Sequence, residues 1–239
     1  LPLYKYFAER LLTNKEFMLI RRYFKTASSI LVLAVASVLA LSCAKGDEYV
    51  VISGYAQGGT YAVKFNLNGK DGRVRPEPEE IRDSIDAILQ RIDRSLSGYN
   101  KNSILSRFNA GETVCPDEFF FDLYAKSYAV YQETRGVVDV ASAPLFDIWG
   151  FGFSKGELPD DKTVASVMSM SGMSRLSPDL RSSAGEDGSL SADDIVLDGG
   201  KMPKLNFNAV AQGYSCDVIA SYLYSIGVKD MLVDIGEFF

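Results

Sequence analysis

The 239-residue sequence contains no histidine. A Ser-His-Asp triad, a Cys-His pair and a zinc site with histidine ligands are therefore excluded within this chain. Its chemistry must use carboxylates, hydroxyls, amides, backbone groups or a hard cation such as Mg²⁺ held by oxygen ligands. The three cysteines, Cys43, Cys115 and Cys216, do not have the spacing of metal ligands.

The chain also has fewer basic than acidic residues: 25 Lys and Arg residues and 31 Asp and Glu residues give a net charge of -6. Domains that bind nucleic acid are usually basic, so we expect no nucleic-acid partner. The length is sufficient for one sizeable domain or two small ones. The sequence shows neither an internal repeat nor a linker to a second domain, which favours one domain.

The N-terminal region has the pattern of an export leader. Met18 opens a short basic stretch, and an apolar run follows at residues 30–41. This order is typical of a signal peptide, and the run is too short for a comfortable membrane span. The run ends at Ser42-Cys43, which resembles a bacterial lipoprotein signal in which the cysteine is lipidated. The alternative is a plain secretory leader in which Cys43 is incidental.

These boundaries predict a lipid-anchored protein of the bacterial cell envelope that faces the periplasm. Residues 18–42 are then the signal peptide, Cys43 is the lipidation site, and residues 43–48 form a polar tether. Residues 1–17 precede Met18, and we interpret them as translated upstream sequence outside the fold. We expect the folded domain to begin at residue 49 and to run to residue 239.

Hydrophobic periodicity predicts that the domain contains both strands and helices. The expected strands are residues 49–67, with a glycine-rich interruption at 58 and 59, and residues 231–235. The expected helices are residues 77–97, 117–134, about 162–170 and a last helix that ends near Ile226. Residues 195–197 and 204–208 are predicted to pair as a hairpin through Asp198-Gly199-Gly200.

The stretch LNFNAVAQGYSCDVI, residues 205–219, combines the pattern of a strand with that of a helix. Leu205 and Phe207 alternate with Asn206 and Asn208, and small residues then open the helix. Free N–H groups at a helix start favour an anion such as a phosphate, and small residues allow it to approach. The alternative is that Asn208 is an N-cap and that the small residues pack against a sheet.

Two further residues are candidates from their context alone. Tyr99 lies in a polar loop after the predicted helix 77–97. A tyrosine in such a loop is less readily assigned to the hydrophobic core. Asp139 lies in an apolar run, where a carboxylate is either hydrogen-bonded for structure or placed for function. The sequence leaves both possibilities open for Asp139. In the same loop as Tyr99, Ser103 is a candidate to cap the next short turn.

Five segments in order resemble the bacterial FAD:protein FMN transferases of the ApbE type. The segments are QGGTY (57–61), SGYNKNSILSRFN (97–109), DVASAPLFDIWGFG (139–152), LNFNAVAQGYSCD (205–217) and LVDIG (232–236). The resemblance implies an α+β fold with a mixed or antiparallel sheet and packed helices. It also implies an enzyme that binds FAD with Mg²⁺, cleaves its pyrophosphate and transfers FMN to a Thr or Ser hydroxyl of a target protein. The implied target is a subunit of a membrane redox complex.

The resemblance also implies roles for single residues near the flavin. Tyr99 matches a flavin-contacting tyrosine of the family, and Gln57 stands where the family commonly has a methionine near the flavin. Val137, Val138 and Asp139 match a segment that lines the FAD site.

Two more matches concern the segment at residues 205–217. Asn206 stands where many family members have an aspartate, so it keeps a hydrogen-bonding group without a negative charge. Ala209 matches a position whose backbone carbonyl is a metal ligand in relatives. The small residues at this helix start are then explained as room for a diphosphate and its cation.

The resemblance finally implies that the domain is incomplete at its C-terminus. In the family, a later segment carries a histidine-containing stretch and the aspartate and threonine that complete the metal site. No catalytic residue is therefore assigned within this chain, and we expect it to transfer no FMN by itself. The alternatives are a lipid-anchored FAD-binding protein without transferase activity and a fragment that does not fold stably.

Overall fold

The computed structural model describes residues 21–28, 47–151, 158–201 and 203–236. The chain divides into two units, Leu1–Asp47 and Glu48–Phe239. In the first unit, residues 21–28 form an exposed helix. The apolar run and Cys43 lie outside the described residues, so the signal peptide and the lipidation site stay predictions. Across the described ranges, the helices are all too short or too polar to cross a membrane.

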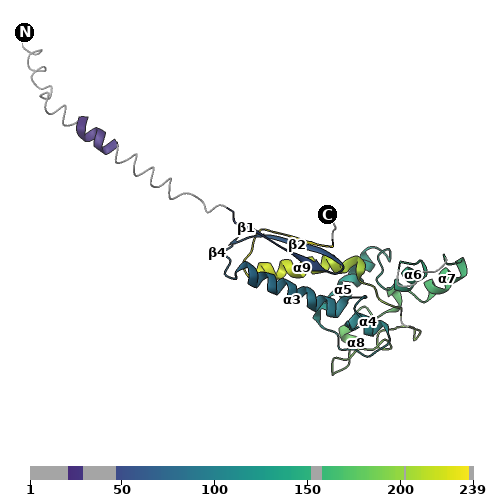
Figure 1. Ribbon diagram of the computed structural model, residues 1–239. Helices are drawn as coiled ribbons and strands as arrows, with labels where there is room; N and C mark the ends of the chain where they lie inside the picture. The colour runs from purple at the N-terminus through teal and green to yellow at the C-terminus, as the bar shows by residue number, and fades with distance from the viewer. Residues whose placement is uncertain (1–20, 29–46, 152–157, 202, 237–239) are drawn as a thin grey trace, which may run out of the picture. The chain divides into compact units, whose positions relative to one another are not determined.

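The second unit is built on a three-stranded antiparallel sheet (Figure 1). Strands β1 (Tyr49–Ala56) and β2 (Gly59–Asn66) pair along their whole length, and β5 (Met231–Ile235) pairs with β2. The order is β1-β2-β5. The glycine-rich interruption is the tight turn between β1 and β2, where Gln57 and Gly58 have positive φ angles of 53° and 81°. A two-residue ladder, β3 (Asn68–Gly69) with β4 (Gly72–Arg73), follows.

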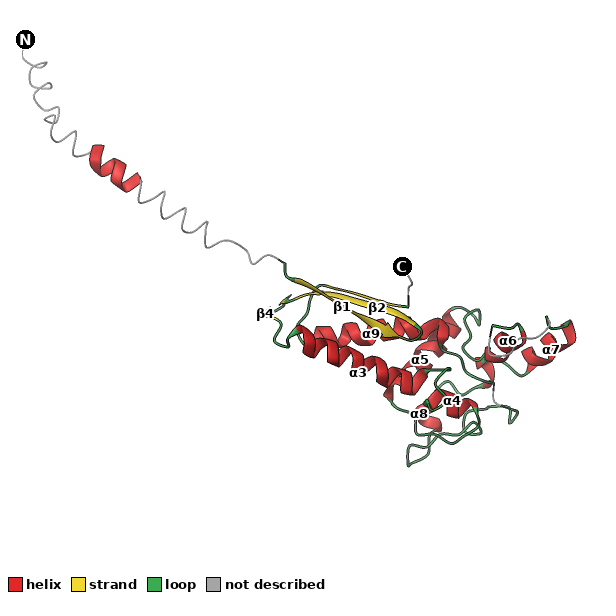
Figure 2. Cartoon of the chain, in the orientation of Figure 1, coloured by secondary structure: helices red, strands yellow, loops and turns green. Residues whose placement is uncertain are grey.

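Two long helices, α3 (Pro78–Leu96) and α9 (Asn208–Ser225), pack beneath the sheet (Figure 2). α3 forms because its start carries its own signals: Pro78 is the first helical residue, and Glu77 and Glu80 form a reciprocal capping box. The remaining helical segments are α4 (Ile104–Asn109), α5 (Glu118–Glu133), α6 (Ala143–Ile148), α7 (Asp161–Ser169), η1 (Met173–Arg175) and α8 (Leu180–Ser183).

Two hydrophobic clusters form the core of this unit, and α3 and α9 contribute to both. The first lies between the sheet and the two helices, and it includes Phe65, Ile85 and Ile219. The second lies among the end of α3, the start of α9 and the shorter helices, and it includes Phe108 and Phe207. α9 therefore packs against the sheet in the first cluster and against the shorter helices in the second.

The predicted hairpin between residues 195–197 and 204–208 is wrong. Val196 instead forms an isolated antiparallel bridge with Leu176. The Asn109 side chain binds the later segment, because its Nδ2 donates to the Leu205 carbonyl and its Oδ1 accepts from the Leu205 N–H, both at 2.8 Å. A side-chain amide presents the same donor and acceptor as a peptide group, so Asn109 takes the place of a strand partner.

The start of α9 also differs from the capping alternative. Phe207 occupies the N-cap position without a side-chain cap, and the helix begins at Asn208. The backbone N–H of Asn208 donates to Asn206 Oδ1 at 2.8 Å. Asn208 is therefore not the N-cap, and its own side chain remains available for another contact.

Candidate functional site

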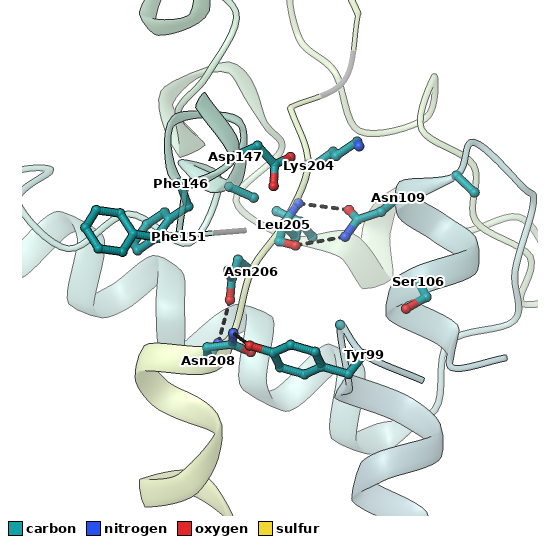
Figure 3. A pocket seen from close by; sticks show the side chains of 13 residues that line it. Tyr99, Ser106, Asn109, Phe146, Asp147, Phe151, Lys204, Leu205, Asn206 and Asn208 are labelled. Atoms are coloured by element: carbon teal, nitrogen blue, oxygen red, sulfur yellow. Dashed lines mark hydrogen bonds between the residues drawn. The ribbon is translucent and has the colours of Figure 1, made fainter. Parts of the chain in front are cut away.

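Two cavities meet at the start of α9. The first has a volume of about 320 Å³ and is lined by Gly98, Tyr99, Ser106, Asn109, Ala110, Ala143, Phe146, Asp147, Phe151, Lys204, Leu205, Asn206 and Asn208 (Figure 3). The second has a volume of about 520 Å³ and is lined by Gln57, Gly58, Gly59, Ile92, Asp93, Leu96, Ser97, Tyr99, Asn208, Ala211, Gln212 and Gly236. Tyr99 and Asn208 line both cavities, so they form the boundary between them.

A hydrogen bond joins the two residues of this boundary. Asn208 Nδ2 donates to the Tyr99 hydroxyl at 3.1 Å (Figure 3). The Tyr99 side chain is 69% exposed, which excludes a role in the hydrophobic core. Tyr99 and Asn206, both expected to contact FAD, are thus each joined to Asn208 by a hydrogen bond.

The first cavity combines a cation with aromatic and amide groups. Lys204 is exposed and makes no ion pair with a described residue. Phe146 and Phe151 offer exposed rings on the same cavity, 46% and 79% exposed. Asn206 is half-buried there, with its N–H bound to the Val140 carbonyl at 2.7 Å. A cation beside aromatic rings suits a ligand with both a phosphate and a ring system.

The second cavity is bounded by the β1–β2 turn, where Gln57 is strained and only partly satisfied. A positive φ is uncommon for a residue other than glycine. Gln57 Nε2 donates to Ser215 Oγ at 2.5 Å, while Gln57 Oε1 is buried without a partner among the described residues. The end of β5 packs closely on α9, because a Cβ at Gly236 would lie 2.1 Å from the Gln212 side chain. Only glycine fits at that position.

The segment Val137–Asp139 lies apart from both cavities, since none of its three residues lines either one. Val137 is 85% exposed. Asp139 accepts from the Ala141 N–H at 2.8 Å, and its Oδ2 accepts from the Met173 N–H at 3.1 Å. Asp139 therefore makes structural hydrogen bonds to the backbone, and FAD contact by this segment stays a prediction.

The donor set for Mg²⁺ is not complete in the described residues. They contain no group of three or more Asp, Glu, Cys or His side chains that would hold a metal ion. Ala209 is the second residue of α9, and a carbonyl inside a helix points toward the C-terminal end of the helix. Mg²⁺ requires an octahedron of oxygen atoms, usually with one or two carboxylates. The described residues show no assembled ligand group for the ion, and Ala209 as a ligand stays a prediction.

Two ionisable side chains of α9 remain protonated at neutral pH. Burial, with a further contribution from a hydrogen bond to Asp122, raises the pKa of Tyr214 well above its usual range. Burial and the nearby Asp234 carboxylate raise the pKa of Cys216. Cys115 and Cys216 are both free thiols. Cys216 therefore does not supply a thiolate nucleophile, and neither Tyr214 nor Cys216 lines one of the two cavities.

Sequence reasoning did not identify Asn208, Asn109 or Lys204 as site residues. Asn208 was considered only as a helix cap, because the local pattern does not show that Tyr99 lies opposite it. Asn109 ends the SRFN stretch, but its contact with Leu205 spans 96 positions of sequence. The available signal was the pair of asparagines in LNFN, which indicates two amides near one helix start.

The comparison with known families decides the assignment. The profile of the ApbE family matches residues 58–238. The chain belongs to the ApbE family. The chain is 29% identical over 220 residues to an FAD:protein FMN transferase of Haemophilus influenzae, covering 89% of this chain and 59% of the relative. It is 30% identical over 215 residues to the enzyme of that name from Vibrio cholerae, covering 85% and 58%.

Solved ApbE structures have the same fold. The flavin transferase ApbE from Vibrio cholerae matches with a TM-score of 0.64 and 27% identity, over 80% of this chain and 58% of that chain. The apo flavinyl transferase ApbE from Pseudomonas stutzeri matches with a TM-score of 0.63 and 28% identity, over 79% and 59%. The predicted α+β ApbE fold is thus confirmed. This ApbE chain spans somewhat less than 60% of the length of these relatives.

Proposed function

We propose that the two cavities bind one molecule of FAD and that the chain belongs to an FAD:protein FMN transferase. One observation carries the proposal: in an ApbE-family domain, two cavities meet at a helix start. FAD has the matching form, because its two ring systems are joined by a diphosphate. Each ring system then occupies one cavity, and the diphosphate passes the start of α9.

The start of α9 has the chemistry for that diphosphate. The N–H of Ala209 makes no hydrogen bond to a described residue, and the next two N–H groups share the Phe207 carbonyl. Backbone N–H groups and the positive end of the helix dipole both favour a phosphate. Lys204 adds a positive charge at the adjoining cavity. These groups bind the anion directly, without a metal ion.

The isoalloxazine ring is assigned to the second, larger cavity, and the adenine ring to the first. The two residues expected near the flavin, Gln57 and Tyr99, both line the second cavity, which supports this orientation. Phe146 and Phe151 provide rings for the adenine in the first cavity. In the proposed reaction, a Ser or Thr hydroxyl of a target protein forms a bond to the FMN phosphorus, and AMP leaves.

Two assays on the full 239-residue chain test this function. We expect saturable FAD binding that does not depend on Mg²⁺, because the described residues offer no carboxylate cluster for the ion. We expect no covalent flavin on an acceptor protein with an exposed threonine, measured as flavin fluorescence in a denaturing gel. Absence of FAD binding would refute the proposal. Covalent flavin on the acceptor would show that these residues suffice for transfer.

A second candidate function is FAD binding without transfer. The same lack of a metal-ligand group among the described residues favours it. The two candidates differ when the chain is supplied with an intact ApbE relative. A transferase domain that lacks only its metal ligands is expected to compete with the relative for the target protein, whereas a simple flavin carrier competes only for FAD.

We also propose that the protein is anchored to the cell envelope through a lipid on Cys43 and faces the periplasm. The basic stretch, apolar run and Ser42-Cys43 support this location. Expressed from Met18 in a bacterium that processes lipoproteins, the protein is expected to partition into detergent. Cys43→Ala should abolish the partition and change the mobility on a gel. An unchanged partition would contradict lipidation.

A further inference from the structure

One hydrogen bond at the boundary of the two cavities joins parts of the chain that are distant in sequence. The Asn208 side chain at the start of α9 donates to the Tyr99 hydroxyl, across 109 positions. We propose that Asn208 is a positioning residue that sets the Tyr99 ring between the two cavities, in the orientation that a bound dinucleotide requires. This inference rests on the proposed function, because it assumes that the ligand spans both cavities.

Core packing does not account for this contact. Asn208 is exposed and Tyr99 is 69% exposed, so the bond covers little apolar surface. A hydrogen bond between groups that water reaches adds little to folding stability, since water replaces it in the unfolded chain. The bond does restrict the side-chain torsions of an exposed aromatic ring. Its effect is therefore expected in binding rather than in stability.

Asn208 is well placed to hold the ring because its own backbone is fixed. Its N–H donates to Asn206 Oδ1 at 2.8 Å, and the Asn206 N–H donates to the Val140 carbonyl at 2.7 Å. It is also the first residue of an 18-residue helix. The series of bonds from Val140 through Asn206 and Asn208 ends on the Tyr99 hydroxyl. Figure 3 shows its last two bonds, from Asn208 to Asn206 and to Tyr99. The ring is thus tied to a helix start that is itself held by hydrogen bonds.

The consequence for a ligand depends on its length. FAD reaches both cavities, so it must pass the Tyr99–Asn208 pair and contact the ring that the bond orients. FMN or AMP occupies only one cavity and therefore depends less on contact with the Tyr99–Asn208 pair. Losing the bond therefore weakens FAD more than it weakens either half, because only FAD loses the benefit of a preorganised boundary.

A double-mutant cycle measures this coupling. FAD is titrated calorimetrically into the full chain and into Tyr99→Phe, Asn208→Ala and the double variant. Each single change is expected to raise the Kd for FAD roughly fivefold, the effect of about one hydrogen bond. The double variant is expected to bind as the weaker single variant does, because both changes remove the same bond. Independent effects that multiply in the double variant would overturn the proposal.

The matched control is Asn102→Ala, which removes an exposed amide in the loop that contains Tyr99. Asn102 lines neither cavity, and its backbone N–H, which remains in the variant, donates to Asn100 Oδ1. We expect this control to leave the Kd for FAD unchanged. A loss equal to that of Asn208→Ala would mean that any disturbance of the loop suffices, and would overturn the proposal.

A readout without ligand separates this inference from the proposed function. In the apo protein, the ring signals of isotopically labelled Tyr99 are expected to shift and narrow in Asn208→Ala and to stay in place in Asn102→Ala. Unchanged ring signals in Asn208→Ala would refute the positioning role, whatever the affinity for FAD. A normal ring response together with no FAD binding by the unsubstituted chain would refute the proposed function and, with it, the role in ligand binding.

Discussion

The two long helices α3 and α9 pack side by side against one sheet, yet they begin in different ways. The start of α3 is satisfied by its own sequence, through Pro78 and the reciprocal bonds of Glu77 and Glu80. The N-cap residue of α9 is Phe207, whose side chain has no group that could cap the helix, and this start lies where the two cavities meet. Unsatisfied N–H groups are costly when buried but useful beside a ligand. The difference indicates which helix start serves structure and which serves binding.

The middle sections of the two helices are buried in the same core cluster, and substitutions there are expected to have the largest effect. Ile85 of α3 and Ile219 of α9 are both 0% exposed and lie in the same cluster. Ile85→Ala and Ile219→Ala are each expected to lower the free energy of unfolding by about 2–5 kcal/mol, because each leaves a cavity in the core. Urea unfolding measures the loss. A loss of unfolding free energy below about 1 kcal/mol for either variant would contradict the claim that both helices are packed in the core alike.

The next largest effect is expected on FAD binding at the start of α9. Tyr99→Ala is expected to weaken FAD binding by about 1–3 kcal/mol, the range for a base stacked on an aromatic side chain. The melting midpoint of the apo protein should move little, because the ring is 69% exposed. Calorimetric titration and thermal melting check the two parts. Collapse of stability with unchanged affinity in the folded fraction would show that Tyr99 supports the fold instead.

A smaller pair of changes compares the two helix starts directly. Glu80→Ala removes one bond of the α3 capping box, and Asn206→Ala removes the acceptor for the Asn208 N–H. Each is expected to cost about 0.5–2 kcal/mol of unfolding free energy, as lost caps do. Only Asn206→Ala should also weaken FAD, because Asn206 lines a cavity. Equal effects of both on the Kd for FAD would remove the distinction between the helix starts.

The smallest effect at neutral pH concerns the bond that ties β2 to α3. Tyr61 donates to Asp86 Oδ1 at 2.5 Å, and burial, followed by this bond, raises the pKa of Tyr61 from 10.0 to about 12. Since the pKa is higher in the folded state, the stabilisation is complete below pH 10 and is lost as the pH rises through 12. Tyr61→Phe should flatten the fall of the melting midpoint over that range. An identical alkaline profile in the variant would contradict the assignment.

The contrast between α3 and α9 also explains which features of the fold could be predicted from the sequence. The prediction for α3 was residues 77–97 and the helix spans Pro78–Leu96, because its proline, acidic start and apolar stripe are all local signals. The hairpin predicted at residues 195–208 failed because the partners of Leu205 and Asn206 are Asn109 and Val140. Such contacts depend on the tertiary fold and leave no periodic pattern in the segment itself.

Local patterns in the sequence indicated Tyr99 and the helix start at residues 205–219, and the resemblance to a family added the expected roles. Of the residues to which the resemblance pointed, Gln57, Tyr99 and Asn206 line the cavities at the start of α9. The segment Val137–Asp139 and Ala209 line neither cavity. The bond between Tyr99 and Asn208 lay beyond the reach of local patterns, since it spans 109 positions. A close contact between side chains of a loop and a helix start becomes visible only when both are placed in space.

The most direct test of the central claim is a calorimetric titration of the full chain with FAD, FMN and AMP under the same conditions. If one ligand spans both cavities, FAD binds with one-to-one stoichiometry and about tenfold or more tighter than either half, because its two parts are linked. Binding of FAD no tighter than that of FMN, or no saturable binding at all, would contradict a dinucleotide site at the start of α9.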